Sequence, residues 1–392
     1  SVFNPKARLW IKGRRRQTIL KQESSIWFHF ASLGEFEQGR PVLEKIRIQH
    51  PGKKIIITFF SPSGYEIRKN TPLADAVYYL PLDTAANAQA FINAIRPEIA
   101  IFTKYEYWYE YFNELNKRQI PLYIISGIFR DSQVFFKWNG GLHRKILSFV
   151  TYFFLQDENS KQLLHSIGIN NTTVSGDTRF DRVWENARQP RPLPGIAEFI
   201  NSHKTIICGS TWPEDEKLLV TLLNEYTDWK FIFAPHEINR EKINRLMNLF
   251  PAQTVIKHSD IVTTEATGQY QSLIIDNIGM LSSLYQYGHI AYIGGGFGVG
   301  IHNTLEAAAF GLPVIFGPNY LKFKEACDLV KLQAGFTIGN EAELKAIMNN
   351  LTNDDGFYKT SSEKAGNYVA EQKGATDMIL ANINVTNTIL PA

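Results

Sequence analysis

Residues 289–317 read HIAYIGGGFGVGIHNTLEAAAFGLPVIFG, and this stretch decides the fold. Two short apolar runs, 289–294 and 313–317, are typical of buried strands. Between them lie a glycine-rich loop and a helix that we expect to begin near Thr304. A strand, a helix and a second strand in close succession form a βαβ unit, which favours a parallel sheet with a right-handed crossover.

The same alternation of apolar runs and helical spacing extends over most of the chain. The runs are rich in β-branched and aromatic residues and do not alternate strictly, as in strands that are buried on both faces. In the first half they are 26–31, 54–60, 99–103, 121–126 and 150–156, and in the second half 204–209, 229–234 and 272–276 join the two above. Two βαβ series predict an α/β protein with two Rossmann-like domains.

The boundary between the two series is expected at 185–196, ENARQPRPLPGI, where three prolines and a glycine interrupt any regular element. The chain of 392 residues also exceeds what one hydrophobic core usually holds. We therefore expect a basic segment at 1–25 and Rossmann-like domains at 26–186 and 197–392. The last helix of the second domain is a candidate to return to the first.

Composition excludes several classes of protein. Hydrophobic residues make up 44% and charged residues 20%, which is typical of a folded globular protein and not of a disordered chain. Cys208 and Cys327 are too few for a disulfide framework and are not spaced as a metal pair, so a reducing compartment is expected. The sequence has no apolar stretch of 18 residues and no secretory signal pattern. We predict neither a metal nor a cofactor.

The first 22 residues combine positive charge with apolar side chains. Seven of the residues 1–22 are Lys or Arg and none is acidic, while the net charge of the whole chain is +3, so the remainder carries −4. Phe3 and Trp10 are among the interleaved apolar residues. Such a segment is suited to an anionic membrane surface. A solvated basic helix is the alternative.

The glycine-rich loop 294–300 is the first candidate site. Glycines such as Gly295 and Gly296 let a backbone approach a ligand closely, and the helix start after His302 and Asn303 favours a phosphate. The alternative is a tight turn with a capping box between Asn303 and Glu306. The pattern is neither the G-x-G-x-x-G dinucleotide motif nor a P-loop.

Two further strand ends in the second half add to this site. In CGSTWPEDE, 208–216, Ser210 and Thr211 lie between a strand and a helix, where either is also a good helix cap. In FAPHEINR, 233–240, His236 follows a strand, and such a histidine is as often structural as functional. Three strand ends at one edge of a sheet are expected to build one pocket.

The first half offers ionisable residues at the corresponding positions. Glu35, Lys104 and Glu106 follow predicted strands, and Ser63 and Arg130 in neighbouring strand-end stretches are further candidates for catalysis or acceptor binding. Glu35 either caps a helix or acts as a base, and the helix dipole should keep it ionised. One half with a nucleotide-like site and one with a carboxylate together indicate a sugar-nucleotide glycosyltransferase.

Several longer stretches carry a resemblance to a known family. They are ASLGEFEQGRPVLEKI (31–46), TFFSPSGYE (58–66), YYLPLD (78–83), YEYWYE (105–110), VSGDTRFDRV (174–183), GSTWPEDE (209–216) and IGGGFGVGIHNTLEAAAFGLPVIFGPNYLKFKEA (293–326). In order and spacing they resemble the transferases of 3-deoxy-D-manno-oct-2-ulosonic acid (Kdo) of bacterial lipopolysaccharide synthesis. The resemblance runs from about residue 26 to about residue 330.

The resemblance implies the glycosyltransferase-B fold, no catalytic metal, and inverting transfer of Kdo from CMP-Kdo to a lipid A precursor. It implies that Glu35 is the base and that His302, Asn303 and Glu306 face CMP. It also implies work at the cytoplasmic face of the inner membrane, with a membrane anchor preceding this chain. The alternatives are an epimerase or hydrolase acting on a sugar nucleotide, or a non-enzymatic sensor.

The chain departs from the family pattern at three places. The family often has E-T-E-L-W-P-N where this chain has KYEYWYE at 104–110, so Lys104 replaces an acid. The sequences KFKE at 322–325 and APHE at 234–237 also differ, and the second lacks an arginine expected at a phosphate contact. These differences concern substrate contacts and the number of Kdo units added.

Overall fold

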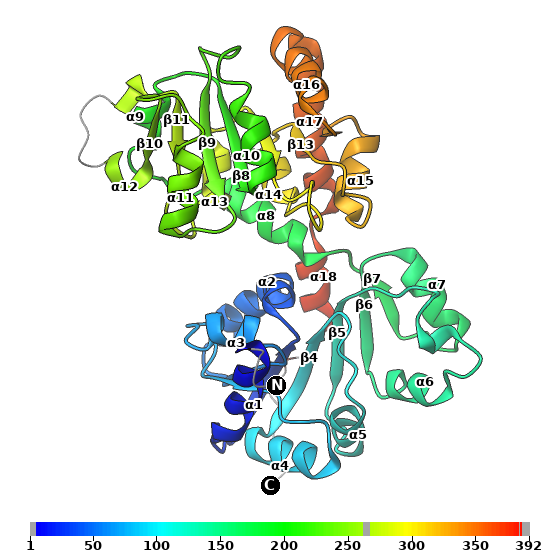
Figure 1. Cartoon of the computed structure of the whole chain (residues 1–392). Helices are drawn as coiled ribbons and strands as arrows, with labels where there is room; N and C mark the ends of the chain where they lie inside the picture. Colours follow the sequence, from blue (N-terminus) through cyan, green and yellow to red (C-terminus); the bar gives the residue numbers. More distant parts are fainter. Residues whose placement is uncertain (1–4, 262–266, 384, 386–392) are drawn as a thin grey trace. The chain divides into compact units, whose positions relative to one another are not determined.

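The computed structural model describes residues 5–261, 267–383 and 385 and divides the chain into two compact units (Figure 1). Unit 1 comprises Ser1–Asp181 and Gln372–Ala392, and unit 2 comprises Arg182–Glu371. The first boundary lies inside a helix, α8 (Thr178–Arg188). Residues 185–188 of the expected linker are therefore helical, and the helix ends shortly before Pro190, which disfavours helical backbone in the residue before it.

Unit 1 contains one parallel sheet of seven strands in the order β3-β2-β1-β4-β5-β6-β7. Its strands are β1 (Ser25–Phe30), β2 (Ile55–Phe59), β3 (Ala76–Tyr79), β4 (Pro97–Thr103), β5 (Leu122–Gly127), β6 (Tyr152–Leu155) and β7 (Thr172–Val174). Its helices are α1 (Pro5–Arg16), α2 (Leu33–Gln49), α3 (Pro62–Arg68), α4 (Ala85–Ile95), α5 (Tyr109–Lys117), η1 (Val134–Phe136), α6 (Gly141–Leu147), α7 (Glu158–Ser166) and the start of α8.

Unit 2 contains a second parallel sheet of seven strands, in the order β10-β11-β9-β8-β12-β13-β14. Its strands are β8 (Thr205–Thr211), β9 (Lys230–Pro235), β10 (Val255–Lys257), β11 (Ser272–Ile274), β12 (Ile290–Ile293), β13 (Val314–Phe316) and β14 (Gly335–Thr337). Its helices are α9 (Ile196–Ile200), α10 (Pro213–Val220), α11 (Arg240–Met247), α12 (His258–Ile261), η2 (Thr267–Gln269), α13 (Leu281–Leu284), η3 (Tyr285–Tyr287), α14 (Leu305–Ala309), α15 (Lys324–Lys331), α16 (Glu341–Asn353) and most of α17 (Asp355–Gln372).

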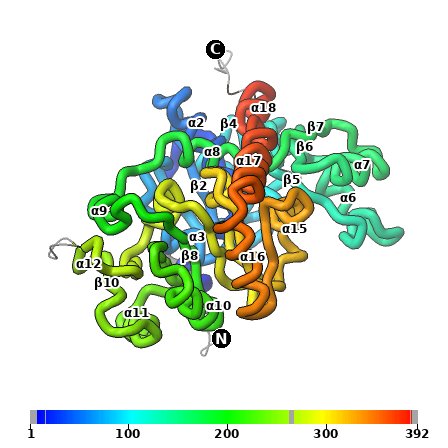
Figure 2. The backbone as a smooth tube through the Cα atoms, turned by 90° about the horizontal axis from the view of Figure 1, so that it is seen from above, coloured from blue at the N-terminus to red at the C-terminus, as the bar shows by residue number. Residues whose placement is uncertain are grey.

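After α17 the chain re-enters unit 1 as α18 (Ala375–Asn382), which lies beside α2 (Figures 1 and 2). Asp181, buried at the start of α8, accepts hydrogen bonds from the backbone N–H of Gly374 and from the backbone and side chain of Thr376. Lys45 of α2 and Asp377 of α18 form an ion pair at 2.6 Å. These contacts fix the returning helix to unit 1.

Each sheet reverses its strand order at one place. In unit 1 the chain moves outward from β1 to β2 and β3 and then returns to place β4 on the other side of β1. In unit 2 the same reversal places β12 beside β8. Ligands of open parallel sheets bind beyond the carboxyl ends of the strands at such a switch point. The loops after β1 and β4, and after β8 and β12, are therefore the places to examine.

The core of unit 1 lies on both faces of its sheet, which explains the unbroken apolar runs. Along β1, Phe28 and Phe30 pack in one buried cluster and Trp27 packs in the other. Side chains alternate between the faces of a strand, so His29 lies on the face of Trp27, where its ring is 4.8 Å from that of Phe102. One polar side chain thus enters an aromatic layer.

The basic N-terminal segment packs partly against unit 1. Arg14 donates hydrogen bonds to the carbonyls of Leu80 and Phe60, both at 2.8 Å, and its guanidinium lies 3.9 Å from the ring centre of Trp10. Burial lowers the pKa of Arg14 to about 10. The Trp10 ring itself packs against Phe60, with 5.7 Å between ring centres. Two residues that the sequence assigned to a membrane surface therefore have structural partners.

Gln17 adds a second attachment of this segment. Its side-chain amide donates to the carbonyl of Tyr79 at 2.7 Å and accepts from the N–H of Tyr79 at 2.9 Å. Tyr79 lies on the edge strand β3. Arg8, Lys12, Arg15 and Lys21 remain exposed, while Phe3 lies outside the described residues. Across the described residues, no helix is both long and apolar enough to cross a membrane.

Candidate functional site

Glu35 lies in the first turn of α2, directly after β1. Ser32 precedes the helix, and its hydroxyl donates to Glu35 Oε2 at 3.3 Å. Burial raises the pKa of Glu35, and the negative charge of Glu106 raises it further, while Ser32 and Lys104 act in the opposite direction. The pKa of Glu35 is therefore raised, which is opposite to the shift that the helix dipole alone predicts. A carboxylate with a raised pKa is better matched to proton abstraction near neutral pH.

Glu106 is connected to the sheet through His29. His29 is fully buried, with Nδ1 at 2.8 Å from Thr58 Oγ1. Its Nε2 lies 3.5 Å from Glu106 Oε2 and 3.4 Å from Nε1 of Trp108. Burial lowers the pKa of His29, so the ring is neutral at pH 7. In the tautomer with its hydrogen on Nε2, His29 donates to Glu106. In the other tautomer, Nε2 carries no hydrogen and accepts the N–H of Trp108.

His29 was not among the sequence candidates, although a signal for it existed. It is the only charged or strongly polar side chain of the run IWFHF, 26–30. A polar residue in a strand that is buried on both faces must find a hydrogen-bond partner, because an unsatisfied buried polar group costs about 1–3 kcal/mol. The partners, Thr58 and Glu106, lie on other strands or loops and cannot be identified from sequence spacing.

Positive charge surrounds the same edge of the sheet. Lys104 follows β4 in the left-handed conformation, with φ of 61°, and its charge opposes the rise in the pKa of Glu35. Burial acts to raise the pKa of Asp177, but Arg179 and, to a smaller extent, Lys104 lower it. Tyr105, 40% exposed, is influenced electrostatically by Arg130, Glu35 and Arg179, among other groups. Unit 1 thus combines carboxylates and cations at the β1–β4 switch point.

The other first-half candidates, Ser63 and Arg130, lie shortly after strands β2 and β5 of the same sheet. Ser63 is exposed at the start of α3, and its backbone N–H and hydroxyl contact Ser61 at 3.3 and 3.1 Å. Arg130 is exposed after β5, and its backbone N–H donates to Gln133. The structure therefore brings Glu35, Lys104 and Glu106 into one electrostatic group, while Ser63 is bonded locally.

In unit 2 a buried carboxylate connects the two loops of the switch point. Asp215, in the first turn of α10, accepts hydrogen bonds from the backbone N–H groups of Trp212 and Gly295, both at 2.9 Å. It also accepts from the hydroxyl of Tyr292 at 2.7 Å. The side chain has no exposed surface. Asp215 therefore holds the turn after β8 against the glycine-rich loop after β12, a role that the sequence did not reveal.

The glycines of this loop are explained first by the packing of the chain on itself. A Cβ on Gly296 would lie 2.6 Å from the backbone of Gly317, and one on Gly295 would lie 2.5 Å from the carbonyl oxygen of Gly300. Gly295 also has φ of 94°, which favours glycine. The sequence attributed both glycines to space for a ligand, and the structure gives a second reason, the close packing of the chain. Their contact with a ligand remains a prediction.

The helix after the loop begins where the sequence predicts, near Thr304, but it is short. α14 begins at Leu305 and has five residues, with Thr304 as its N-cap. Asn303 accepts the N–H of Leu305 at 3.1 Å and donates to Glu306 Oε1 at 3.2 Å. Glu306 thus contacts the side chain of Asn303. A helix of five residues has a small dipole, so the dipole argument for a phosphate is weakened.

His236 and His302 form an aromatic stack with Trp212. The two histidine rings lie 4.3 Å apart and are nearly parallel, and His236 lies 4.8 Å from the ring of Trp212. Trp212 Nε1 donates to His302 Nε2 at 3.1 Å, which places the hydrogen of His302 on Nδ1. Burial, followed by the charge of His236, lowers the pKa of His302 to about 4. His302 is therefore a neutral hydrogen-bond donor at pH 7.

The remaining second-half candidates lie at the end of β8. Ser210 has φ of 53°, a conformation that residues other than glycine adopt rarely. Thr211 is buried, and its hydroxyl donates to Glu216 at 3.3 Å. Neither caps α10, because Trp212 occupies that position. Thr211 therefore has a structural partner, and Ser210 forms a strained turn next to the stack.

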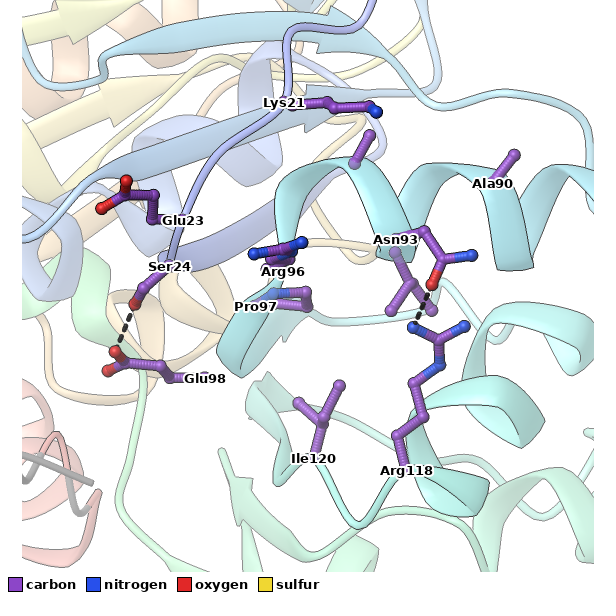
Figure 3. Close-up of a pocket in the computed structure, with 12 residues that line it drawn as sticks. Lys21, Glu23, Ser24, Ala90, Asn93, Arg96, Pro97, Glu98, Arg118 and Ile120 are labelled. Atoms are coloured by element: carbon purple, nitrogen blue, oxygen red, sulfur yellow. Dashed lines mark hydrogen bonds between the residues drawn. The ribbon is translucent and has the colours of Figure 1, made fainter. Parts of the chain in front are cut away.

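A cavity of unit 1 lies away from the candidate residues. Among the described residues, no group of three His, Cys, Asp or Glu side chains is arranged to hold a metal ion. A cavity of about 660 Å³ in unit 1 is lined by residues such as Lys21, Arg96 and Glu98 (Figure 3). It lies at the amino ends of β1 and β4, opposite to the edge that carries Glu35. None of the candidate residues lines it.

The fold is shared with solved enzymes of low sequence identity. The UDP-GlcNAc 2-epimerase of Neisseria meningitidis superposes with a TM-score of 0.63, at 16% identity, over 91% of this chain and 98% of the epimerase. MurG of Acinetobacter baumannii superposes with a TM-score of 0.57, at 10% identity, over 92% of this chain and 98% of MurG. Together with the two Rossmann-like sheets, these similarities show the glycosyltransferase-B fold.

Sequence comparison identifies the family. Residues 6–182 match the family model described as 3-deoxy-D-manno-octulosonic-acid transferase (kdotransferase). The transferase of this name from Chlamydia muridarum is 26% identical, over 87% of this chain and 81% of its own, and that from Aquifex aeolicus is 24% identical, over 86% and 88%. The family model over residues 6–182 and these relatives support a glycosyltransferase of the Kdo transferase family.

One relative is longer than this chain. A bifunctional glycosyltransferase/methyltransferase of Fusobacterium nucleatum is 25% identical over 94% of this chain, which spans 58% of that relative.

Proposed function

We propose that the protein transfers Kdo from CMP-Kdo to a sugar hydroxyl of a lipid A precursor, with inversion at the anomeric carbon. The observation that carries the proposal is Glu35, a half-buried carboxylate with a raised pKa beside Glu106 at the β1–β4 switch point. The segment that contains both residues matches the Kdo transferase family model.

In this proposal Glu35 is the general base. A sugar hydroxyl is a poor nucleophile and must lose its proton as its oxygen attacks the anomeric carbon. The carboxylate of Glu35 takes that proton, a bond forms between the acceptor oxygen and the anomeric carbon, and the bond from that carbon to the CMP phosphate oxygen breaks. CMP leaves with the bonding electrons. Attack opposite to the leaving phosphate inverts the configuration.

The donor is assigned to unit 2. Neutral His302 offers Nδ1–H as a hydrogen-bond donor, and Glu306 offers carboxylate oxygens for ribose hydroxyls. Asp215 keeps the glycine-rich loop in place. In this assignment recognition of the phosphate depends on hydrogen bonds and not on a cationic histidine.

We further propose that the enzyme works at the cytoplasmic face of the inner membrane, where a lipid acceptor lies. Exposed Arg8, Lys12, Arg15 and Lys21 of the N-terminal segment support attraction to anionic lipids, at about 1 kcal/mol for each residue close to the surface. Arg14 and Trp10 are not counted, because both pack against the protein. Flotation with anionic and neutral vesicles at low and high salt tests this part.

The deciding experiment for the reaction is incubation with CMP-Kdo and a lipid A precursor, with the product followed by mass spectrometry. Transfer predicts that the acceptor gains one or more Kdo units while CMP is released. A hydrolase would release Kdo equally fast without the acceptor, and an epimerase would alter a sugar nucleotide without releasing CMP. Either of those outcomes, or no reaction at all, would overturn the proposal.

A further inference from the structure

The segment between β5 and α6 presents a tryptophan at the surface of unit 1. Trp138 is 94% exposed and Leu142 is 64% exposed. Tryptophan is among the residues that proteins usually bury at least in part, and its full exposure removes the favourable burial of a large apolar ring. Exposed apolar residues that gather in one segment are typical of an interaction surface.

The turn at residues 137–140, which carries Trp138, is stabilised by hydrogen bonds from neighbouring residues. The N–H of Gly140 donates to the carbonyl of Lys137 at 3.0 Å, which closes a turn around Trp138 and Asn139. Arg144 donates to the carbonyls of Phe135 and Lys137 at 3.4 and 3.3 Å. Trp138 therefore lies in a turn that is fixed by hydrogen bonds.

Aromatic packing anchors the same segment to the core. Phe135 is buried, and its ring lies 5.2 Å from Tyr107 and 6.1 Å from Phe129. Tyr107 belongs to the loop after β4 that also carries Lys104 and Glu106. The exposed turn is thus attached, through buried rings, to the loop at the candidate site.

The charge around the turn selects one class of partner. Residues 130–145 contain Arg130, Lys137, Arg144 and Lys145 against a single acid, Asp131. Lys137 and Lys145 are exposed on either side of Trp138 and Leu142. Tryptophan and leucine side chains are stable where lipid headgroups meet the acyl chains, and the flanking lysines attract anionic headgroups.

We propose that residues 134–145 form a membrane-docking element, in which Trp138 and Leu142 enter the headgroup layer of an anionic bilayer. The choice of a bilayer rests on the proposed function, since a lipid acceptor brings the enzyme to a membrane. The element is separate from the N-terminal segment, and it anchors the lobe that carries Glu35. Insertion of two apolar side chains makes part of the binding insensitive to salt.

The test is vesicle flotation of the full chain with the variant W138S/L142S. On vesicles containing phosphatidylglycerol, we expect about tenfold weaker binding than that of the wild type, and the difference should persist at high salt. K137Q/K145Q should lose binding mainly at low salt, because it removes only charge. The matched control is I278S, since Ile278 is 90% exposed in unit 2 and lies next to Asp276.

A second measurement locates the ring itself. Lipids brominated near the headgroup should quench the fluorescence of the wild type more than that of W138F. Transfer to an acceptor dispersed in detergent micelles should be equal in W138S/L142S and the wild type, so failure of the reaction and failure of docking give separate results. Unchanged flotation of W138S/L142S would overturn the proposal, as would a wild-type dimer that this variant converts to a monomer.

Discussion

The two units use the same kind of sheet and the same switch point, yet burial shifts the pKa of one candidate residue in each unit, Glu35 and His302, in opposite directions. In unit 1 burial raises the pKa of Glu35, and in unit 2 it lowers the pKa of His302 to about 4. The cause is the same, because removing water disfavours the charged form of either group. One unit thereby gains a stronger base, and the other gains a neutral hydrogen-bond donor.

The comparison also shows how each unit holds its site. Unit 1 uses the neutral ring of His29 to contact Glu106 at 3.5 Å, and a second carboxylate then lies close enough to influence Glu35. Unit 2 uses the carboxylate of Asp215, which accepts three hydrogen bonds, from the turn after β8, from β12 and from the loop after β12. The proposed function assigns the base to unit 1 and the positioning of the donor to unit 2.

The largest expected effect is a loss of turnover in a variant of Glu35, and its absence would contradict the placement of the base in unit 1. Glu35→Gln keeps the shape of the side chain and removes the base, so turnover should fall by about 10²–10⁴-fold. Calorimetry should show unchanged affinity for CMP, because the donor is assigned to unit 2. Near-normal turnover of the variant would leave Glu35 as a helix-capping residue.

The second prediction concerns stability of unit 2. Asp215→Ala leaves the N–H groups of Trp212 and Gly295 and the hydroxyl of Tyr292 without their acceptor. The free energy of unfolding should fall by about 2–4 kcal/mol, as measured by urea titration. Glu214→Ala is the control in the same turn, since Glu214 is exposed and should change stability by less than about 0.5 kcal/mol. Equal effects of both variants would contradict the role of Asp215.

The third prediction sharpens the donor assignment. His302→Ala and Glu306→Ala should each weaken CMP binding by about tenfold, the usual effect of one lost hydrogen bond. Calorimetry measures both, with Glu35→Gln as the variant that should bind normally. Unchanged affinity in both variants would place the nucleotide elsewhere. Because the pKa of His302 is about 4, NMR of the free protein should show its ring neutral from pH 6 to pH 8.

The smallest expected effect is a pair of opposite pH shifts. Glu106 raises the pKa of Glu35 and Lys104 lowers it. Activity requires ionised Glu35 and is lost as pH falls through its pKa. In Glu106→Gln the acidic limb of the kcat/KM profile should therefore move to lower pH, and in Lys104→Gln it should move to higher pH. Shifts in the same direction would show that the variants act through structure and not through charge.

The interior of both sheets was predictable from sequence, and their edges were not. All ten predicted runs are strands, namely β1, β2, β4, β5, β6, β8, β9, β11, β12 and β13. The four strands without a prediction, β3, β7, β10 and β14, are the edges of the two described sheets. An interior strand of a parallel sheet is covered on both faces and reads as an apolar run. Edge strands such as Thr172–Val174 are short and mixed in polarity.

The positions of the candidate sites were predictable from sequence, but the hydrogen-bond partners of their residues were not. Strand ends at the switch points located Glu35, Lys104 and the loop 294–300, because topology places those ends at one edge. The partners that hold them were missed. Asp215 looked like an ordinary acid in a first turn, and its three donors come from residues up to 80 positions away. Such networks depend on tertiary contacts, which no local pattern encodes.

The contact between Gln17 and the edge strand β3 has a practical consequence for handling the protein. The amide of Gln17 occupies the N–H and C=O of Tyr79, the groups through which another strand would pair. An exposed edge of this kind is a template for aggregation. A shortened chain that begins after Gln17, made to weaken attraction to lipids, should therefore precipitate more readily during purification. Removal should stop before Gln17, so that the edge remains covered.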